Sequence, residues 1–194
     1  NEIINGKWSR EANRGYELKN KTVGLIGYGH TGKSFAKKLS GFDVSTIFFD
    51  LKSNLKNEFA TEVTLKEIKE TADVISIHSS LTKESYEILN TKFINECKKP
   101  FWLINTSRGN CVKIKDLIKG IKEKKVLGAA LDVLEFEKKS FEKLLETSLS
   151  NDDFSFLINS KKIILTPHIA GWTHESKLLL VKIILDKIKK LFAL

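Results

Sequence analysis

The most constraining feature of this sequence is a glycine-rich stretch, VGLIGYGHTG, at residues 23–32. A short apolar run ends there in Gly-x-Gly-x-x-Gly, and an amphipathic segment follows at once. This order predicts a buried strand, a tight turn at Gly27 and the start of a helix. Gly29 would let a pyrophosphate approach the backbone, and Gly32 would let helix and strand pack closely. The first free N–H groups of the helix would then face the anion.

Glycines also punctuate ordinary loops, so the pattern alone is a weak indication of a nucleotide site. A second apolar run, residues 44–49, strengthens it because it ends in Asp50. In dinucleotide-binding units the ribose-binding acid comes about 20 residues after the glycines. The two runs together favour a βαβ nucleotide-binding unit over a plain strand–loop–helix.

Apolar runs alternate with helical patterns along the rest of the chain. Strands are expected at residues 21–26, 44–49, 73–78, 101–105, 126–131 and 163–166. Helices are expected at 31–39, 64–71, in a turn around Phe93, at 113–124 and at about 173–193, with an irregular stretch at 134–160. Continuous apolar strands are typical of a parallel sheet covered on both faces. The predicted fold is therefore α/β, a Rossmann-type doubly wound, mostly parallel sheet with helices on both faces.

Length and composition limit the alternatives. A chain of 194 residues with 41% hydrophobic residues suits one globular domain, with at most a small appendage. The net charge of +9 is spread over the chain and interleaved with glutamate, which favours a solvated basic surface over a DNA-binding face. No apolar run reaches the roughly 20 residues that cross a bilayer. Cys97 and Cys111 have no metal-ligand spacing. We therefore expect a cytoplasmic protein with no metal, nucleic-acid or membrane partner.

Polar residues with chemical potential follow the expected strands. Ligands bind at the carboxyl ends of the strands in a doubly wound sheet. The residues found there are Asp50, His78, Arg108, Asp132 and His168. Taken singly, each has an ordinary explanation: a surface arginine, a histidine that closes a strand or, for Glu137 farther on, a solvated acid in a charged run. Their shared placement is more informative than any one of them.

Four motifs in order resemble the nucleotide-binding domain of the D-isomer-specific 2-hydroxyacid dehydrogenases, and most of all the D-3-phosphoglycerate dehydrogenase members of that family. They are residues 24–32 (GLIGYGHTG), 104–109 (INTSRG), 128–133 (GAALDV) and 166–171 (TPHIAG). The resemblance covers roughly residues 8–177. It implies an NAD-dependent oxidoreductase that transfers a hydride between NAD(H) and a D-2-hydroxy acid/2-oxo acid pair, with serine biosynthesis as the setting.

The resemblance also implies a role for each matching residue. Arg108 would grip the carboxylate and carbonyl of a 2-oxo acid, a task for which a planar guanidinium fork is suited. His168 would exchange a proton with the carbonyl oxygen, and Glu137 would pair with that histidine and orient its ring. An acid at Asp50 would repel a 2′-phosphate, so NAD is expected rather than NADP. The implied cofactor-binding residues are Gly27, Gly29, His30, Thr31, Gly32, Asp50, Ser79, Thr106, Ser107, Asp132 (beside the nicotinamide amide), Ala170 and Gly171.

The sequence departs from the family pattern in three respects. Ser80 and Lys138 stand where family members commonly have proline, and the segment 138–160 is longer than usual. Family members also begin with a substrate domain of about a hundred residues, whereas residues 1–20 here resemble only the end of an interdomain helix and a connector. Residues 21–172 would form the NAD-binding domain and 173–194 a C-terminal helix. We therefore expect a fragment that binds NAD but turns over poorly or not at all alone.

Two further questions stay open at this stage. The apolar arc of the last helix is wide enough either for deep packing within the domain or for contact with another domain or subunit. The family implies homodimers. An alternative to the enzyme is a non-catalytic NAD-sensing interaction module, as corepressor relatives of the family suggest, although intact Arg108, Glu137 and His168 disfavour it. A nucleic-acid-binding protein rests on the net charge alone.

Overall fold

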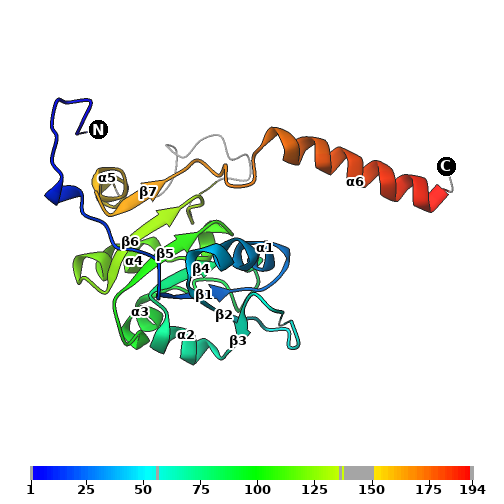
Figure 1. Ribbon diagram of the computed structural model, residues 1–194, viewed down its shortest axis with the longest axis horizontal. Helices are drawn as coiled ribbons and strands as arrows, with labels where there is room; N and C mark the ends of the chain where they lie inside the picture. Colours follow the sequence, from blue (N-terminus) through cyan, green and yellow to red (C-terminus); the bar gives the residue numbers. More distant parts are fainter. Residues whose placement is uncertain (1, 56, 136, 138–150, 193–194) are drawn as a thin grey trace.

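The computed structural model describes residues 2–55, 57–135, 137 and 151–192. Its centre is a seven-stranded parallel sheet in the order β3-β2-β1-β4-β5-β6-β7 (Figure 1). The strands are β1 (Thr22–Ile26), β2 (Ser45–Phe49), β3 (Thr61–Glu62), β4 (Val74–Ile77), β5 (Phe101–Asn105), β6 (Val126–Leu131) and β7 (Ile163–Leu165). The strand order reverses between β1 and β4, and such a reversal places a ligand crevice at the carboxyl ends of the strands. The predicted fold class is confirmed.

Helices connect the strands. The α-helices are α1 (His30–Leu39), α2 (Leu65–Thr71), α3 (Thr91–Glu96), α4 (Ile114–Lys122), α5 (Asn151–Asn159) and α6 (His174–Phe192), and 3-10 turns form at η1 (Glu11–Asn13), η2 (Ser40–Phe42) and η3 (Gly109–Cys111). The capping box expected from the sequence is present at α2: Glu67 N donates to Thr64 Oγ1 at 3.1 Å, and Thr64 N donates to Glu67 Oε2 at 3.0 Å. This reciprocal pair fixes where α2 begins.

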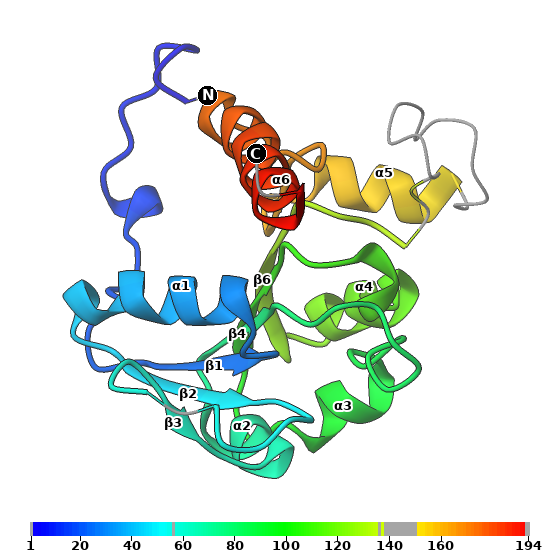
Figure 2. The same ribbon diagram turned by 90° about the vertical axis from the view of Figure 1, so that its right-hand side faces the viewer.

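Two apolar clusters lie on opposite faces of the sheet. Figure 2 shows α1 on one side of the strands and α2 and α3 on the other. On the α1 side the buried residues include Leu25, Ala36 and Phe48. On the other side a larger cluster joins α2, α3, α4 and α5 to the strands, with Ile68 and Leu117 fully buried. The two clusters hold the carboxyl ends of the strands at one edge, where the site lies.

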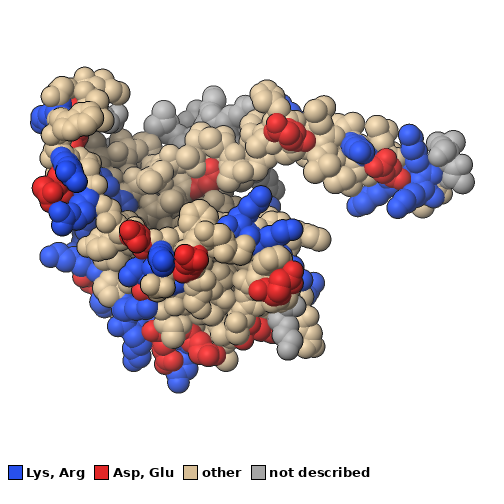
Figure 3. All heavy atoms as spheres, in the orientation of Figure 1, with Lys and Arg blue, Asp and Glu red and all other residues tan. Residues whose placement is uncertain are grey.

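Part of the sheet and all of α6 expose apolar side chains. On the α1 side, Trp102 of β5 is 40% exposed and Ile164 of β7 is 68% exposed. Helix α6 has no buried residue within its described length, and it extends away from the sheet (Figure 1). Of the two roles left open for this helix, deep packing within the domain is therefore excluded in this structure. Figure 3 shows basic and acidic side chains interspersed over the visible face.

Three elements differ from the sequence-based expectation. Residues 151–159, expected to be irregular, form α5, because Leu157 is buried in the larger cluster with Phe156 packed beside it. The two-residue strand β3 is too short to leave a pattern. Residues 2–20 contain turns and the 3-10 turn η1 instead of the end of an α-helix, and side chains from Glu2 to Glu17 are exposed, so no packing stabilises a longer helix. Most of the long segment 138–160 lies outside the described residues. None of the described helices is long and apolar enough to span a membrane.

Candidate active site

The glycine loop joins β1 to α1 as the sequence predicts. Gly27 has φ +96°, a conformation that L side chains rarely adopt, and a Cβ there would lie 2.6 Å from Ser79 N. A Cβ on Gly32 would collide with the carbonyl oxygen of Gly27. Both glycines are therefore required by the fold itself, before any ligand binds.

No such steric constraint applies to Gly29. It is the N-cap of α1, it makes no side-chain cap, and a Cβ there would meet no atom within 4 Å. The space beside it adjoins the free N–H groups of the first helical turn, where His30 and Thr31 are exposed. Open space next to uncapped N–H donors fits a pyrophosphate.

Asp50 closes the other side of this loop from the end of β2. Its Oδ2 accepts a hydrogen bond from Tyr28 N at 2.7 Å, and its Oδ1 accepts one from Lys52 N at 2.9 Å. The Tyr28 ring is buried against Phe48, with ring centroids 3.7 Å apart, and its hydroxyl donates to Asn57 Oδ1 at 2.6 Å. These contacts hold the Asp50 carboxylate beside the glycine loop, as expected for an acid that binds ribose.

The loop after β5 carries Arg108 and is fixed by a residue that the sequence reasoning missed. Asn105 is fully buried; its Oδ1 accepts from Ser107 N (3.1 Å) and Ser107 Oγ (2.9 Å), and its Nδ2 donates to Arg108 O (3.1 Å). The only available signal was a polar residue at the end of an apolar strand. Thr106 and the Arg108 side chain are exposed, and the guanidinium donates to Ser107 O at 2.7 Å.

The Arg108 loop packs directly on the segment that carries Glu137. A Cβ at Gly109 would collide with the carbonyl of Leu134, so the two backbones are in contact. Leu134 N donates to Glu137 Oε1 at 2.7 Å. This places the carboxylate of Glu137 in a fixed position beside the loop after β7.

His168, in that loop, meets Glu137. Its Nδ1 lies 2.8 Å from Glu137 Oε2, and the two side chains are 30% and 13% exposed. The His168 backbone has φ 55°, in the left-handed region that is uncommon for residues other than glycine. The structure therefore brings together the two residues predicted to act as acid/base and partner, whereas the Arg108 guanidinium donates to Ser107 O within its own loop.

Asp132, at the end of β6, lies beneath the same loop. Its carboxylate accepts from Thr166 Oγ1 at 2.5 Å, Ile169 N at 2.9 Å and Ala170 N at 2.9 Å. Burial raises the pKa of this carboxyl, but these hydrogen bonds and the charge of nearby His168 outweigh burial and hold the pKa below its ordinary value. Asp132 is therefore ionised at neutral pH. Ala170 and Gly171, expected at the cofactor, are exposed on the outer side of this loop.

The loop after β4 faces the glycine turn. Ser79 Oγ lies 3.9 Å from Cys111 Sγ, which also accepts from Ser107 Oγ at 3.9 Å. His78 Nε2 lies 2.9 Å from Ser76 Oγ, and burial lowers the pKa of His78 to about 4. His78 is thus neutral at physiological pH, and its ring packs against Phe35 of α1, with ring centroids 5.1 Å apart.

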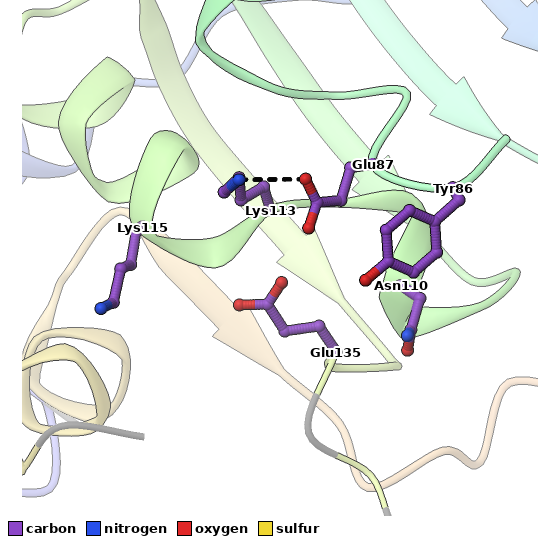
Figure 4. Close-up of a pocket in the computed structure, with 6 residues that line it drawn as sticks. All are labelled: Tyr86, Glu87, Asn110, Lys113, Lys115 and Glu135. Atoms are coloured by element: carbon purple, nitrogen blue, oxygen red, sulfur yellow. Dashed lines mark hydrogen bonds and ion pairs between the residues drawn. The ribbon is translucent and has the colours of Figure 1, made fainter. Parts of the chain in front are cut away.

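A hollow lies at the start of α4, next to the 3-10 turn η3 (Figure 4). It has a volume of about 230 Å³ and is lined by Tyr86, Glu87, Asn110, Lys113, Lys115 and Glu135. Lys113 Nζ and Glu87 Oε2 are paired at 3.0 Å, and Glu135 accepts from Ile114 N at 3.3 Å. Burial raises the pKa of Glu135. Glu135 thus supports the first turn of α4. Among the described residues, no cluster of three or more His, Cys, Asp or Glu could hold a metal ion.

Comparison with known families agrees with this geometry. Residues 1–170 match the family described as D-isomer specific 2-hydroxyacid dehydrogenase, NAD binding domain. The chain belongs to this family. The resemblance stated from the four motifs is confirmed, and the cofactor of this 2-hydroxyacid dehydrogenase domain is NAD.

Individual relatives have different activities. The 2-hydroxyacid dehydrogenase domain is 38% identical over 183 residues to a glyoxylate reductase of Thermofilum pendens, covering 90% of this chain and 50% of that protein. It is 34% identical over 178 residues to D-3-phosphoglycerate dehydrogenase 1 of Saccharomyces cerevisiae, covering 91% of this chain and 38% of that protein. The chain thus spans about half or less of the length of these relatives.

A solved structure agrees with the fold and the cofactor. It is the NAD-complexed D-isomer specific 2-hydroxyacid dehydrogenase of Lactobacillus delbrueckii ssp. bulgaricus, 30% identical to this chain. The TM-score is 0.80, with 93% of this chain and 57% of that chain covered. The 2-hydroxyacid dehydrogenase domain therefore has the fold of a family member that binds NAD.

Proposed function

We propose that this chain carries the cofactor-binding and acid–base half of an NAD-dependent oxidoreductase that interconverts D-2-hydroxy acids and 2-oxo acids. One observation supports this most directly: the 2.8 Å contact between His168 and Glu137 at the carboxyl edge of an NAD-binding sheet. A protein that only senses NAD has no use for an imidazole oriented by a carboxylate. The NAD-sensing module is therefore the weaker candidate.

Each residue has a chemical task in this proposal. The glycine loop and the start of α1 hold the pyrophosphate, and Asp50 holds the adenosine ribose. When bound, the reduced cofactor supplies the hydride. Arg108 pairs with the carboxylate of the 2-oxo acid, which requires its exposed guanidinium to leave the Ser107 carbonyl. His168 donates a proton to the carbonyl oxygen during reduction and removes it during oxidation, while Glu137 keeps the ring oriented.

The relatives do not identify the substrate of this chain, so the choice of substrate is part of our proposal. The relatives include both a glyoxylate reductase and a D-3-phosphoglycerate dehydrogenase. D-3-phosphoglycerate stays our first candidate, on motif resemblance, and serine biosynthesis stays a prediction with it. The 2-oxo acids to compare are 3-phosphohydroxypyruvate, glyoxylate and pyruvate. The expected homodimer also stays a prediction, which sedimentation velocity would measure.

The test separates binding from chemistry. NADH binding is measured by fluorescence, and NADH oxidation is measured in single turnover with the chain in excess, because turnover of the isolated chain is expected to be slow. His168→Ala should slow oxidation by about 10²–10⁴-fold, the usual contribution of general acid–base catalysis, and leave NADH affinity within about twofold. His174→Ala, at the exposed start of α6, is the matched control.

Two outcomes would contradict the proposal. Equal oxidation rates in the wild-type chain, His168→Ala and His174→Ala would remove His168 from the chemistry. Loss of NADH binding in His168→Ala but not in His174→Ala would make His168 a cofactor contact instead of the acid/base.

A further inference from the structure

Four hydrogen-bond donors of one loop converge on a single residue, Asp132. Its carboxylate accepts from Thr166 Oγ1, Ile169 N and Ala170 N, and its backbone carbonyl accepts from His168 N at 2.8 Å. All four donors lie between residues 166 and 170. Asp132 is only 4% exposed, so it faces this loop and not solvent.

The carboxylate of Asp132 is largely occupied by these contacts. An ionised carboxylate offers about four acceptor positions, and Asp132 uses three of them within the chain. Two of the donors are backbone N–H groups of Ile169 and Ala170, which need an acceptor because no helix or strand provides one. The carboxylate thus accepts backbone hydrogen bonds that a helix or a neighbouring strand would accept in regular secondary structure.

The loop needs such a support because of His168. Its φ of 55° is an unfavourable backbone conformation that costs on the order of 1–3 kcal/mol and persists only where surrounding contacts enforce it. Asp132 supplies three of the contacts that enforce it: its backbone carbonyl accepts from the amide of His168, and its carboxylate accepts from the two amides that follow. His168 N also donates to Thr166 O at 3.0 Å. The direction of the His168 ring toward Glu137 depends on this backbone conformation.

We propose that Asp132 is a positioning residue for His168, holding residues 166–170 so that the imidazole meets Glu137. The inference rests on the proposed role of His168 as acid/base. It assigns to Asp132 a task beyond the contact with the nicotinamide amide that the resemblance implies, and this task is performed before any cofactor binds.

The test uses the full chain without cofactor and replaces the carboxylate with an isosteric amide. In Asp132→Asn the amide oxygen can still accept hydrogen bonds from some of these donors. The amide NH₂ group replaces the other carboxylate oxygen, and it cannot accept a hydrogen bond from the donors that faced that oxygen. Hydrogen exchange at the Ile169 and Ala170 amides should therefore speed up by about 10- to 100-fold, the range expected for losing a hydrogen bond to a charged group. Exchange in β1 should not change.

The ring of His168 provides a second readout. Its Nδ1 resonance in nitrogen NMR should move in Asp132→Asn toward the position seen in Glu137→Gln, because the imidazole no longer meets the carboxylate. Asp73→Asn is the matched control: Asp73 also accepts a backbone hydrogen bond, from Thr22 N at 2.8 Å, but at the opposite edge of the sheet. It should leave both readouts unchanged.

A milder pair of variants keeps the test valid if Asp132→Asn folds poorly. Thr166→Val removes one of the four donors and should speed exchange at Ile169, whereas Thr166→Ser keeps the hydroxyl and should match the wild type. Unchanged exchange and an unchanged His168 resonance in Asp132→Asn, with weaker NADH binding, would overturn the inference and leave Asp132 as a cofactor contact only. Neither readout requires NADH oxidation, so failure of the proposed function would be seen separately.

Discussion

Nδ1 of His168 lies 2.8 Å from Oε2 of Glu137, although 31 residues separate them in the chain. The other oxygen of Glu137 accepts from Leu134 N at 2.7 Å, so both of its oxygens are held. A carboxylate fixed in this way sets the orientation of the His168 ring. The pair joins the segment after β6 to the loop after β7.

Replacing Glu137 should impair chemistry more than binding. Glu137→Gln removes the charge from a charge-assisted hydrogen bond, which is typically worth about 1.5–3 kcal/mol. Single-turnover oxidation of NADH by a 2-oxo acid should slow by about 10- to 100-fold, with NADH affinity within about twofold. Glu135→Gln is the matched control, since Glu135 lies two residues away and supports α4 through Ile114 N. Equal slowing in both variants would mean that the segment, and not the Glu137 carboxylate, matters.

Most of the fold was predictable because buried parallel strands are continuous apolar runs. β1 and β5 are of this kind, and the turn between β1 and α1 was fixed by its glycines. Helix α5 was not predictable in the same way, since only Leu157 and its neighbours pack against the sheet. Its acidic first turn, with Asp152 and Asp153, continues a run of charged residues in the sequence.

The place of the candidate site residues at strand ends and the contact between His168 and Glu137 were predictable, whereas the hydrogen bonds that support their loops were not. Residues such as Arg108 and His168 could be found because strand ends meet at one edge of a parallel sheet. The support by Asn105 and Asp132 could not, because it depends on which loop a buried side chain faces. The loop that a buried side chain faces depends in turn on backbone conformations such as the positive φ of His168, which cannot be predicted from the residue type.

Asp50 should decide the cofactor preference. Its carboxylate lies beside the glycine loop, bonded to Tyr28 N and Lys52 N, where a 2′-phosphate would be repelled. The wild-type chain should bind NADH at least about tenfold tighter than NADPH, which corresponds to roughly 1.4 kcal/mol. Asp50→Asn should weaken NADH binding and narrow this preference, as measured by fluorescence titration with both cofactors. Asp116→Asn, whose carboxylate accepts from Thr91 N at 2.7 Å, should change neither. An unaltered preference in Asp50→Asn would contradict the ribose assignment.

Two glycines of the loop, Gly32 and Gly29, should respond differently to alanine. Gly32→Ala forces a Cβ onto the carbonyl of Gly27 and should lower the free energy of unfolding by about 1–3 kcal/mol. Gly29→Ala meets no atom within 4 Å, so stability should fall by no more than about 1 kcal/mol, the cost of a poorer N-cap residue. NADH affinity should nevertheless fall by about tenfold or more, because the methyl group occupies the space proposed for the pyrophosphate.

Urea unfolding and NADH titration measure these two effects, with Gly41→Ala as the matched control. Gly41 lies in η2, outside the loop, and a Cβ there also meets no atom within 4 Å. It should change neither stability nor affinity. Wild-type NADH affinity in Gly29→Ala would place the pyrophosphate elsewhere.

Acid should destabilise the domain through His78. Burial lowers its pKa to about 4, against 6.5 for the ordinary side chain, so between these values the unfolded chain binds the extra proton. Stability from this group is fully present above about pH 6.5 and is lost as the pH falls through about 4. One pKa unit corresponds to 1.36 kcal/mol, so the total loss is about 3 kcal/mol. Urea unfolding at a series of pH values in this range should show that the free energy of unfolding falls less steeply with pH in His78→Gln than in the wild type. His174→Gln, at an exposed position, should keep the wild-type slope, and a wild-type slope in His78→Gln would show that the acid sensitivity arises elsewhere.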